Sequence, residues 1–150
     1  MLACIAPAQF SSAAVLLSPP APNNVVLGTT FYRCSYHEGR LGMTGVYIVF
    51  SLRPTSAALT FKRSAFSFAR EDNAETIDQL ERIEVELANK LGLRDITVVP
   101  GIAIALQAGE LRCASSGRGT TSFVLKVSGL WRSDVACGLV FRILPANRPL

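Results

Sequence analysis

Residues 73–91 read NAETIDQLERIEVELANKL, the segment of the chain with the clearest periodicity. Its apolar side chains recur at helical spacing and form one stripe: Ile77, Leu80, Ile83, Leu87 and Leu91. The spacing predicts an amphipathic helix at about 73–91. Asp72 with Glu75 three residues later predicts a capping box at its start, and Gly92 predicts its end.

Segments with strand spacing lie before and after this helix, and they do not alternate with further helices. In chain order they are residues 31–37, 46–53, 59–69, 96–106, 110–114, 123–131 and 135–143. Strands grouped on both sides of one helix favour antiparallel pairing. The sequence therefore predicts an α+β fold that is mostly antiparallel β. We expect about seven strands, as a sandwich or a single curved sheet, around one central amphipathic helix.

The N-terminal residues 1–24 differ in composition from the rest of the chain. They are rich in Ala and Pro and carry no charged side chain; the first is Arg33. Proline favours extended backbone. We therefore expect residues 1–24 to form an arm on a neighbouring subunit, with a flexible tail as the alternative, and residues 25–150 to form a single β-rich domain. The expected interface residues are Phe10, Leu16, Leu17, Pro19, Pro20 and Trp131.

The composition favours self-association. Apolar residues make up 49% of the 150 residues and charged residues 17%, below the usual share of about 25%. The mean hydropathy is +0.33. A monomer with so few charges would expose much apolar surface, so either the core is unusually large for this length or a partner covers part of that surface. A homo-oligomer is therefore favoured. No transmembrane segment is predicted, because apolar runs such as residues 13–17 are far shorter than the ~20 residues of a membrane span.

Charge is segregated along the chain. Residues 71–95 hold eight of the 11 acidic side chains, and the rest of the chain holds twelve of the 15 basic ones. Acidic helix surfaces and basic strand surfaces are common in solvent, and that is the plain interpretation. The sharper one is that the basic strands bind nucleic acid, or the acidic helix of a neighbour. The expected contact residues are Arg33, Arg53, Lys62, Arg63, Arg112, Arg118, Lys126, Arg132 and Arg142.

The sequence offers little for catalysis or metal binding. None of the four cysteines lies in a C-x-x-C pair and His37 is the only histidine, so no zinc site is expected. Cys34 would point to the opposite face of a strand from His37. The glycine-rich residues 39–45 lack the Lys-Ser/Thr ending of a phosphate-binding loop. We predict no catalytic, cofactor-binding or metal residue, and no enzyme.

The cysteines also bear on the compartment. Four thiols without paired spacing favour free cysteines in an intracellular, reducing compartment, or in a virion if the protein is viral. One disulfide, such as Cys34 with Cys113, is the alternative.

These observations favour a non-enzymatic structural protein that self-assembles through the arm and through complementary acidic-helix and basic-sheet surfaces. Shell, coat and matrix proteins, including viral capsid and matrix proteins, are of this physical type. The alternative is an Arg-rich nucleic-acid-binding module, such as an RNA-binding one, with Tyr32, Tyr36 and Phe66 as stacking platforms. The second alternative is a small enzyme or ligand carrier with a pocket around His37.

Overall fold

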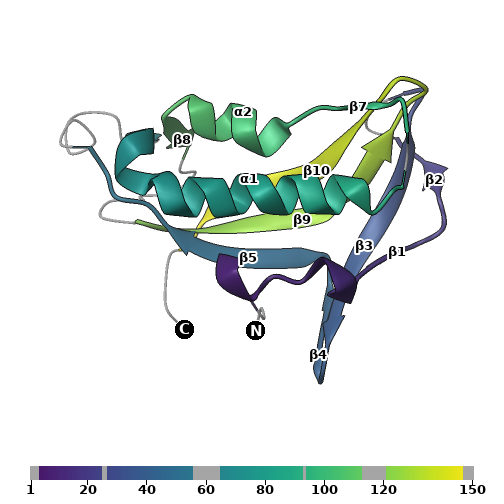
Figure 1. Cartoon of the computed structure of the whole chain (residues 1–150), viewed down its shortest axis with the longest axis horizontal. Coiled ribbons are helices and arrows are strands. Elements are labelled where there is room, and N and C mark those ends of the chain that lie inside the picture. The colour runs from purple at the N-terminus through teal and green to yellow at the C-terminus, as the bar shows by residue number, and fades with distance from the viewer. Residues whose placement is uncertain (1–3, 25–26, 56–64, 93, 113–120, 147–150) are drawn as a thin grey trace.

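The computed structural model describes residues 4–24, 27–55, 65–92, 94–112 and 121–146 (Figure 1). It confirms the predicted α+β class: a curled, mostly antiparallel sheet carries one main helix and one short helix. Figure 1 shows both helices on the same side of the sheet. The sandwich alternative is wrong, because helices rather than a second large sheet cover the inner face. No helix in the described part of the chain is long and apolar enough to cross a membrane.

Eight strands form the main sheet, which runs β1-β3-β9-β10-β7, with β2 and β4 beside β3 and β5 beside β9. Their bounds are β1 (Val15–Leu17), β2 (Ala21–Pro22), β3 (Thr30–Glu38), β4 (Leu41–Thr44), β5 (Val46–Ser51), β7 (Thr97–Val98), β9 (Ser122–Arg132) and β10 (Ala136–Pro145). The pairing of β7 with β10 is parallel, and the other strands of this sheet pair antiparallel. β6 (Ala65–Ser67) and β8 (Glu110–Arg112) form a separate small pair.

The chain changes its pairing partner at Gly45. β4 pairs with the second half of β3, whereas β5 pairs with the first half of β9. Gly45 has a φ of 90°, and a Cβ there would lie 3.0 Å from the Val127 carbonyl oxygen, so only glycine fits without strain. Its N–H donates to the Cys34 carbonyl at 2.8 Å. One edge of β9 is thereby divided between β3 and β5.

The main helix α1 (Ala74–Asn89) packs its apolar stripe against the inner face of the sheet, as predicted. The predicted capping box of Asp72 and Glu75 is wrong. A 3-10 turn (Arg70–Asn73) precedes the helix, and buried Asn73 links it to the end of β5. The Asn73 Oδ1 accepts from the Arg53 N–H at 2.7 Å, and its Nδ2 donates to the Arg53 and Ala69 carbonyls at 3.2 and 2.9 Å.

The prediction of a strand over 96–106 is wrong beyond Val98, because α2 (Gly101–Gln107) follows. The apolar residues at 102, 104 and 106 alternate as in a strand, but 102 and 106 also have helical i, i+4 spacing. The structure buries Ile102 and Leu106 and exposes Ile104. The Glu84 carboxylate of α1 accepts from the Ile102 and Ala103 N–H groups at 2.7 and 3.1 Å. A distant acid therefore satisfies donors that the first turn of a helix leaves free.

Residues 4–24, which the sequence sets apart as an arm, lie against their own chain. Buried Ile5 bridges to Ile48 of β5, and β1 pairs with β3. The rings of Phe10 and Tyr36 lie 6.0 Å apart, and the Ser11 N–H donates to the Tyr36 hydroxyl. Ile5, Ala14 and Val15 of this segment are thus buried in the domain core, whereas residues 19–22 are exposed. An exchange with a neighbouring copy would have to replace the buried contacts.

Leu87 tests the burial of the helix stripe. Its side chain has no exposed surface, whereas Val85 on the same helix is 55% exposed. We expect Leu87→Asp to lower the free energy of unfolding by about 4 kcal/mol or more, because it places an unpaired charge in the core. Val85→Asp, the matched control, should cost less than about 1 kcal/mol. Urea unfolding followed by circular dichroism measures both, and equal effects would contradict this packing.

The pH dependence of stability tests the contact that Glu84 of α1 makes with the first turn of α2. Burial is the main cause that raises the pKa of Glu84 from its ordinary 4.5, against the two N–H groups that lower it. The folded state therefore holds this proton more tightly than the unfolded state. The resulting stability is complete below about pH 4.5 and is lost as the pH rises through the raised pKa.

The measurement is the difference in free energy of unfolding between wild type and Glu84→Gln at about pH 4 and about pH 7. We expect this difference to move in favour of the variant as the pH rises, because Gln does not ionise. Glu75→Gln, which removes an exposed charge from the same helix, is the control. A difference that stays constant with pH would contradict the expected shift.

Candidate functional site

The outer face of the sheet is the face opposite the helices. It consists of the outward side chains of β3, β5, β9 and β10, whose inward neighbours, such as Val46, Ile48 and Leu125, are fully buried. Strand pairing arranges the outward positions in rows. The rows are Val49–Val124–Leu144, Tyr47–Lys126–Arg142, Arg33–Gly129–Val140 and Phe31–Trp131–Gly138. No described helix covers this face (Figure 1).

The outer face carries positive charge without acidic side chains. Arg33, Lys126 and Arg142 lie in two successive rows, and β5, β9 and β10 contain no Asp or Glu. The single acid of β3, Glu38, lies at the β3–β4 hairpin, where it accepts a hydrogen bond from the Tyr36 hydroxyl. The acid-rich helix α1 lies on the other side of the sheet. Part of the charge segregation along the sequence therefore appears in space: three of the twelve basic residues outside 71–95 share the outer face, and the acid-rich helix lies on the opposite side of the sheet.

Aromatic rings lie among these basic residues. Phe31 lies across Gly129, where a Cβ would come within 2.7 Å of its ring, and Trp131 lies across Gly138 at a similar distance. The glycines leave room for rings to rest on the neighbouring strand. The Lys126 Nζ lies 5.8 Å from the centre of the Tyr47 ring. These three half-buried rings give the outer face flat apolar surfaces next to its cations.

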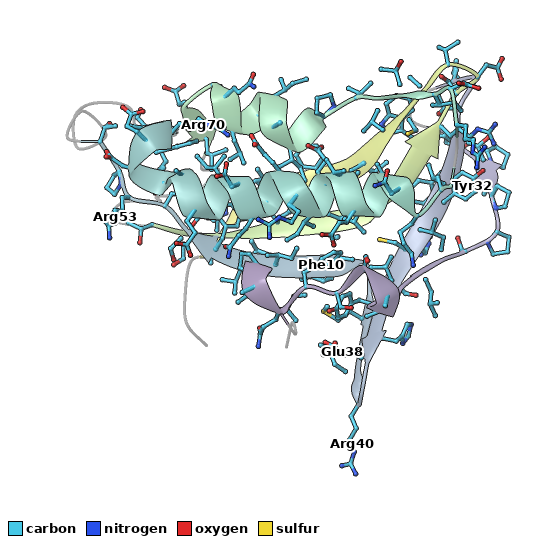
Figure 2. The ribbon with its side chains drawn as sticks, viewed as in Figure 1. Phe10, Tyr32, Glu38, Arg40, Arg53 and Arg70 are labelled. Atoms are coloured by element: carbon cyan, nitrogen blue, oxygen red, sulfur yellow. The ribbon has the colours of Figure 1, made fainter. Side chains whose placement is uncertain are left out.

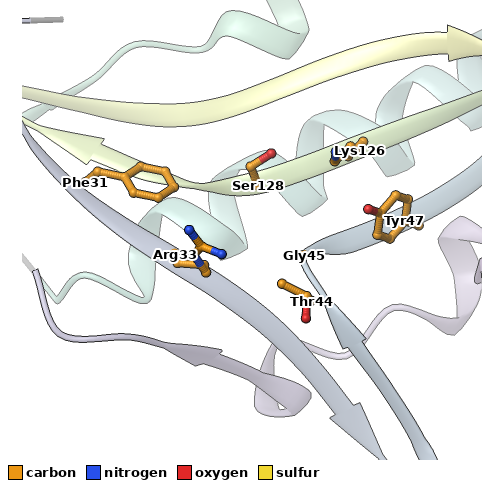
Figure 3. Close-up of a pocket in the computed structure, with 7 residues that line it drawn as sticks. All are labelled: Phe31, Arg33, Thr44, Gly45, Tyr47, Lys126 and Ser128. Carbon is orange, nitrogen blue, oxygen red and sulfur yellow. The ribbon is translucent and has the colours of Figure 1, made fainter. Parts of the chain in front are cut away.

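A hollow opens on the outer face where β9 is divided between β3 and β5 (Figure 3). Its volume is about 290 Å³. It is lined by Phe31, Arg33, Thr44, Gly45, Tyr47, Lys126 and Ser128. Gly45 leaves the β4–β5 junction free of a side chain, and the residues around it supply two rings, two cations and three hydroxyl groups.

The nine predicted anion-contact residues do not all lie together in the structure. Arg33, Lys126 and Arg142 share the outer face. Arg53 lies after the end of β5, at the far end of the molecule in Figure 2, and Arg132 lies at the end of β9, opposite Cys137 in register. Arg112 belongs to β8, in the separate small sheet. The remaining three lie outside the described residues: Lys62, Arg63 and Arg118.

The predicted interface residues also divide. Leu16, Pro19 and Pro20 are exposed, whereas Phe10 and Leu17 pack against the core of their own chain. The sixth, Trp131, lies on the outer face. Two of the three expected stacking platforms are wrong: Tyr36 has no exposed surface and Phe66 is buried, so no base can reach their rings. The third, Tyr32, packs half-buried against the core.

His37 lies exposed on β3, where its Nε2 is 3.1 Å from the Ser35 Oγ, and it does not line the hollow. Cys34 is buried instead, and its thiol donates to the Val127 carbonyl at 3.3 Å. Burial raises the pKa of Cys34 to about 11, so this thiol stays protonated and unreactive at neutral pH. Its suggested partner Cys113 lies outside the described residues. Within those residues, no group of three or more His, Cys, Asp or Glu could hold a metal ion.

Most residues that line the hollow are not among the predicted contact residues. Phe31, Thr44, Tyr47 and Ser128 are not charged, and residues 46–53 suggest a strand that is apolar on both faces. The available signal was the alternation of Val46, Ile48 and Phe50 with Tyr47, Val49 and Ser51, which assigns Tyr47 to the outward side.

The chemistry that the outer face offers is recognition of an anion that carries flat rings. Guanidinium and ammonium groups bind phosphate or carboxylate, and the aromatic rings stack on planar groups. Comparison of the chain with protein-family models, with curated proteins and with solved structures gives no match to any of the three.

Proposed function

We propose that this protein is a non-enzymatic nucleic-acid-binding protein that uses the outer face of its sheet. One observation carries the proposal: Arg33, Lys126 and Arg142 share an acid-free face with exposed parts of aromatic rings. Phosphates supply the charge that such cations attract, and bases supply planes for the rings. A face with cations alone would suit any anion, whereas the rings favour nucleic acid.

The three cations are free to bind a ligand. The ion pairs of the described chain join Arg70 to Asp78 and Glu81, and none involves the outer face. Lys126 and Arg142 are cross-strand neighbours, and like charges in that position repel each other. A bound phosphate would relieve this repulsion. Along β9 the face extends from Lys126 to Trp131, about 17 Å, which is long enough for several contacts to one strand of nucleic acid.

Self-assembly into a shell, coat or matrix is the second candidate. The separation of an acidic helix from a basic sheet face favours it, because complementary patches on one molecule allow head-to-tail contacts. In that case α1 of one copy would cover the outer face of the next. We favour nucleic acid because Arg70 already engages Asp78 at 3.5 Å and Glu81 at 3.0 Å, which removes part of the charge that a neighbour would need.

Combined replacement of Arg33, Lys126 and Arg142 by Ala tests the proposal. We expect the affinity for a labelled oligouridylate to fall by about tenfold or more at low salt. The slope of log affinity against log salt concentration should become shallower by about 2, because three phosphate contacts are lost. Fluorescence anisotropy between about 50 and 200 mM salt measures both quantities.

The control removes the same charge elsewhere. Arg40 is exposed at the tip of the β3–β4 hairpin (Figure 2). Arg82 on α1 and Lys90 at its C-cap are also exposed, and α1 lies on the opposite side of the sheet from the outer face. Their combined replacement by Ala should leave the affinity within about threefold of wild type. Equal losses in both triple variants would contradict an outer-face site. No binding by wild type, together with a large particle mass in light scattering that the outer-face variant loses, would favour assembly instead.

A further inference from the structure

We infer that the hollow between β3, the β4–β5 junction and β9 binds one unpaired nucleotide, so that the ligand of the outer face is a single strand. This inference rests on the proposed function but makes a separate claim. The outer face as a whole attracts nucleic acid through charge, which a duplex also satisfies. The hollow adds a site that only a base outside a stack can enter (Figure 3).

The lining of the hollow matches the parts of a nucleotide. Phe31 and Tyr47 come from different strands and give two aromatic walls on which a base can stack. Arg33 and Lys126 give two cations for the phosphate. Thr44 and Ser128 add hydroxyl groups, which both donate and accept hydrogen bonds, so they suit the edge of a base or a sugar hydroxyl. None of the seven described lining residues carries a carboxylate that would repel the phosphate.

The size of the hollow limits what it can hold. At about 290 Å³ it is slightly smaller than typical ligand pockets, whose volumes begin at about 300 Å³. It can hold one base with its phosphate, whereas a base pair or a dinucleotide cofactor is too large. A base in a duplex would have to leave its stack and its partner before entering, which costs energy that an unpaired base largely avoids.

The hollow is formed by backbone that is already fixed. The Gly45 N–H donates to Cys34 at 2.8 Å, and on either side of Gly45 the strands are paired to β3 and β9. The Lys126 ammonium group lies 5.8 Å from the centre of the Tyr47 ring, so one cation of the hollow lies next to one of its aromatic rings. A site held in place before binding loses little entropy when the ligand arrives.

The experiment fills the hollow without changing its charge. Ser128→Leu and Thr44→Leu each place an apolar side chain in it, and Thr44 is exposed, so its replacement does not disturb the core. The matched control is Ser51→Leu, an exposed serine on the outward side of β5 that does not line the hollow. The probes are a labelled oligouridylate of about 12 nucleotides and an RNA duplex of the same length. Fluorescence anisotropy gives both affinities.

We expect wild type to prefer the single strand, and both hollow-filling variants to lose about tenfold in single-strand affinity with unchanged duplex affinity. Ser51→Leu should match wild type for both probes. Arg142→Ala, which lies outside the hollow, should weaken both probes alike.

Wild-type levels of single-strand binding in both Leu variants would overturn the inference. Retained binding that still depends on Arg142 would then leave the proposed function standing. No binding of either probe by wild type would overturn both.

Discussion

The burial of one helical stripe against one face of the sheet is the contact on which the rest of the structure depends. Ile77, Leu80 and Leu87 have no exposed surface, and they pack with the inward side chains of the central strands. Because side chains alternate along a strand, the same contact turns every second residue of β5, β9 and β10 outward. Because the helix covers the inner face of the sheet, it determines which side chains form the outer face. A one-residue slip of β9 would exchange Leu125 with Lys126 and bury the charge, so the register is strongly determined.

The elements with local signals could be predicted from the sequence, and those made by distant contacts could not. The spacing from Ile77 to Leu91 predicts α1, and the alternation from Phe123 to Val127 predicts β9. By contrast, α2 has an apolar pattern that fits either a strand or a helix. Its first turn bonds to the carboxylate of Glu84, far away in the sequence. In the same way, Asn73 and not the expected Asp72 occupies the N-cap position of α1, and its side chain bonds to the backbone of Arg53, twenty residues away in the sequence.

The candidate site shows the same division. Arg33, Lys126 and Arg142 were predicted because charge segregation is visible in the sequence. The hollow could not be predicted, because it forms at Gly45, where β4 stops pairing with β3 and β5 begins pairing with β9. No local pattern in the sequence shows that β9 becomes the new partner. Phe31 and Trp131 belong to the site because Gly129 and Gly138 lie on the strands beside them. That arrangement depends on the register in which β3, β9 and β10 pair, and this register cannot be read from one sequence.

The mixture of rings and cations on the outer face bears on how a ligand is chosen. Cations alone give an affinity that falls steeply with salt and that does not distinguish a phosphate chain from the acidic helix of a second copy. Stacking on Phe31, Tyr47 and Trp131 depends little on salt, and acidic side chains carry no aromatic ring that could stack on them. Under the proposed function, discrimination between these two kinds of anion would come from the rings, and attraction from the cations. If so, the share of binding that survives high salt reports the rings, and it should be larger for nucleic acid than for any acidic protein surface.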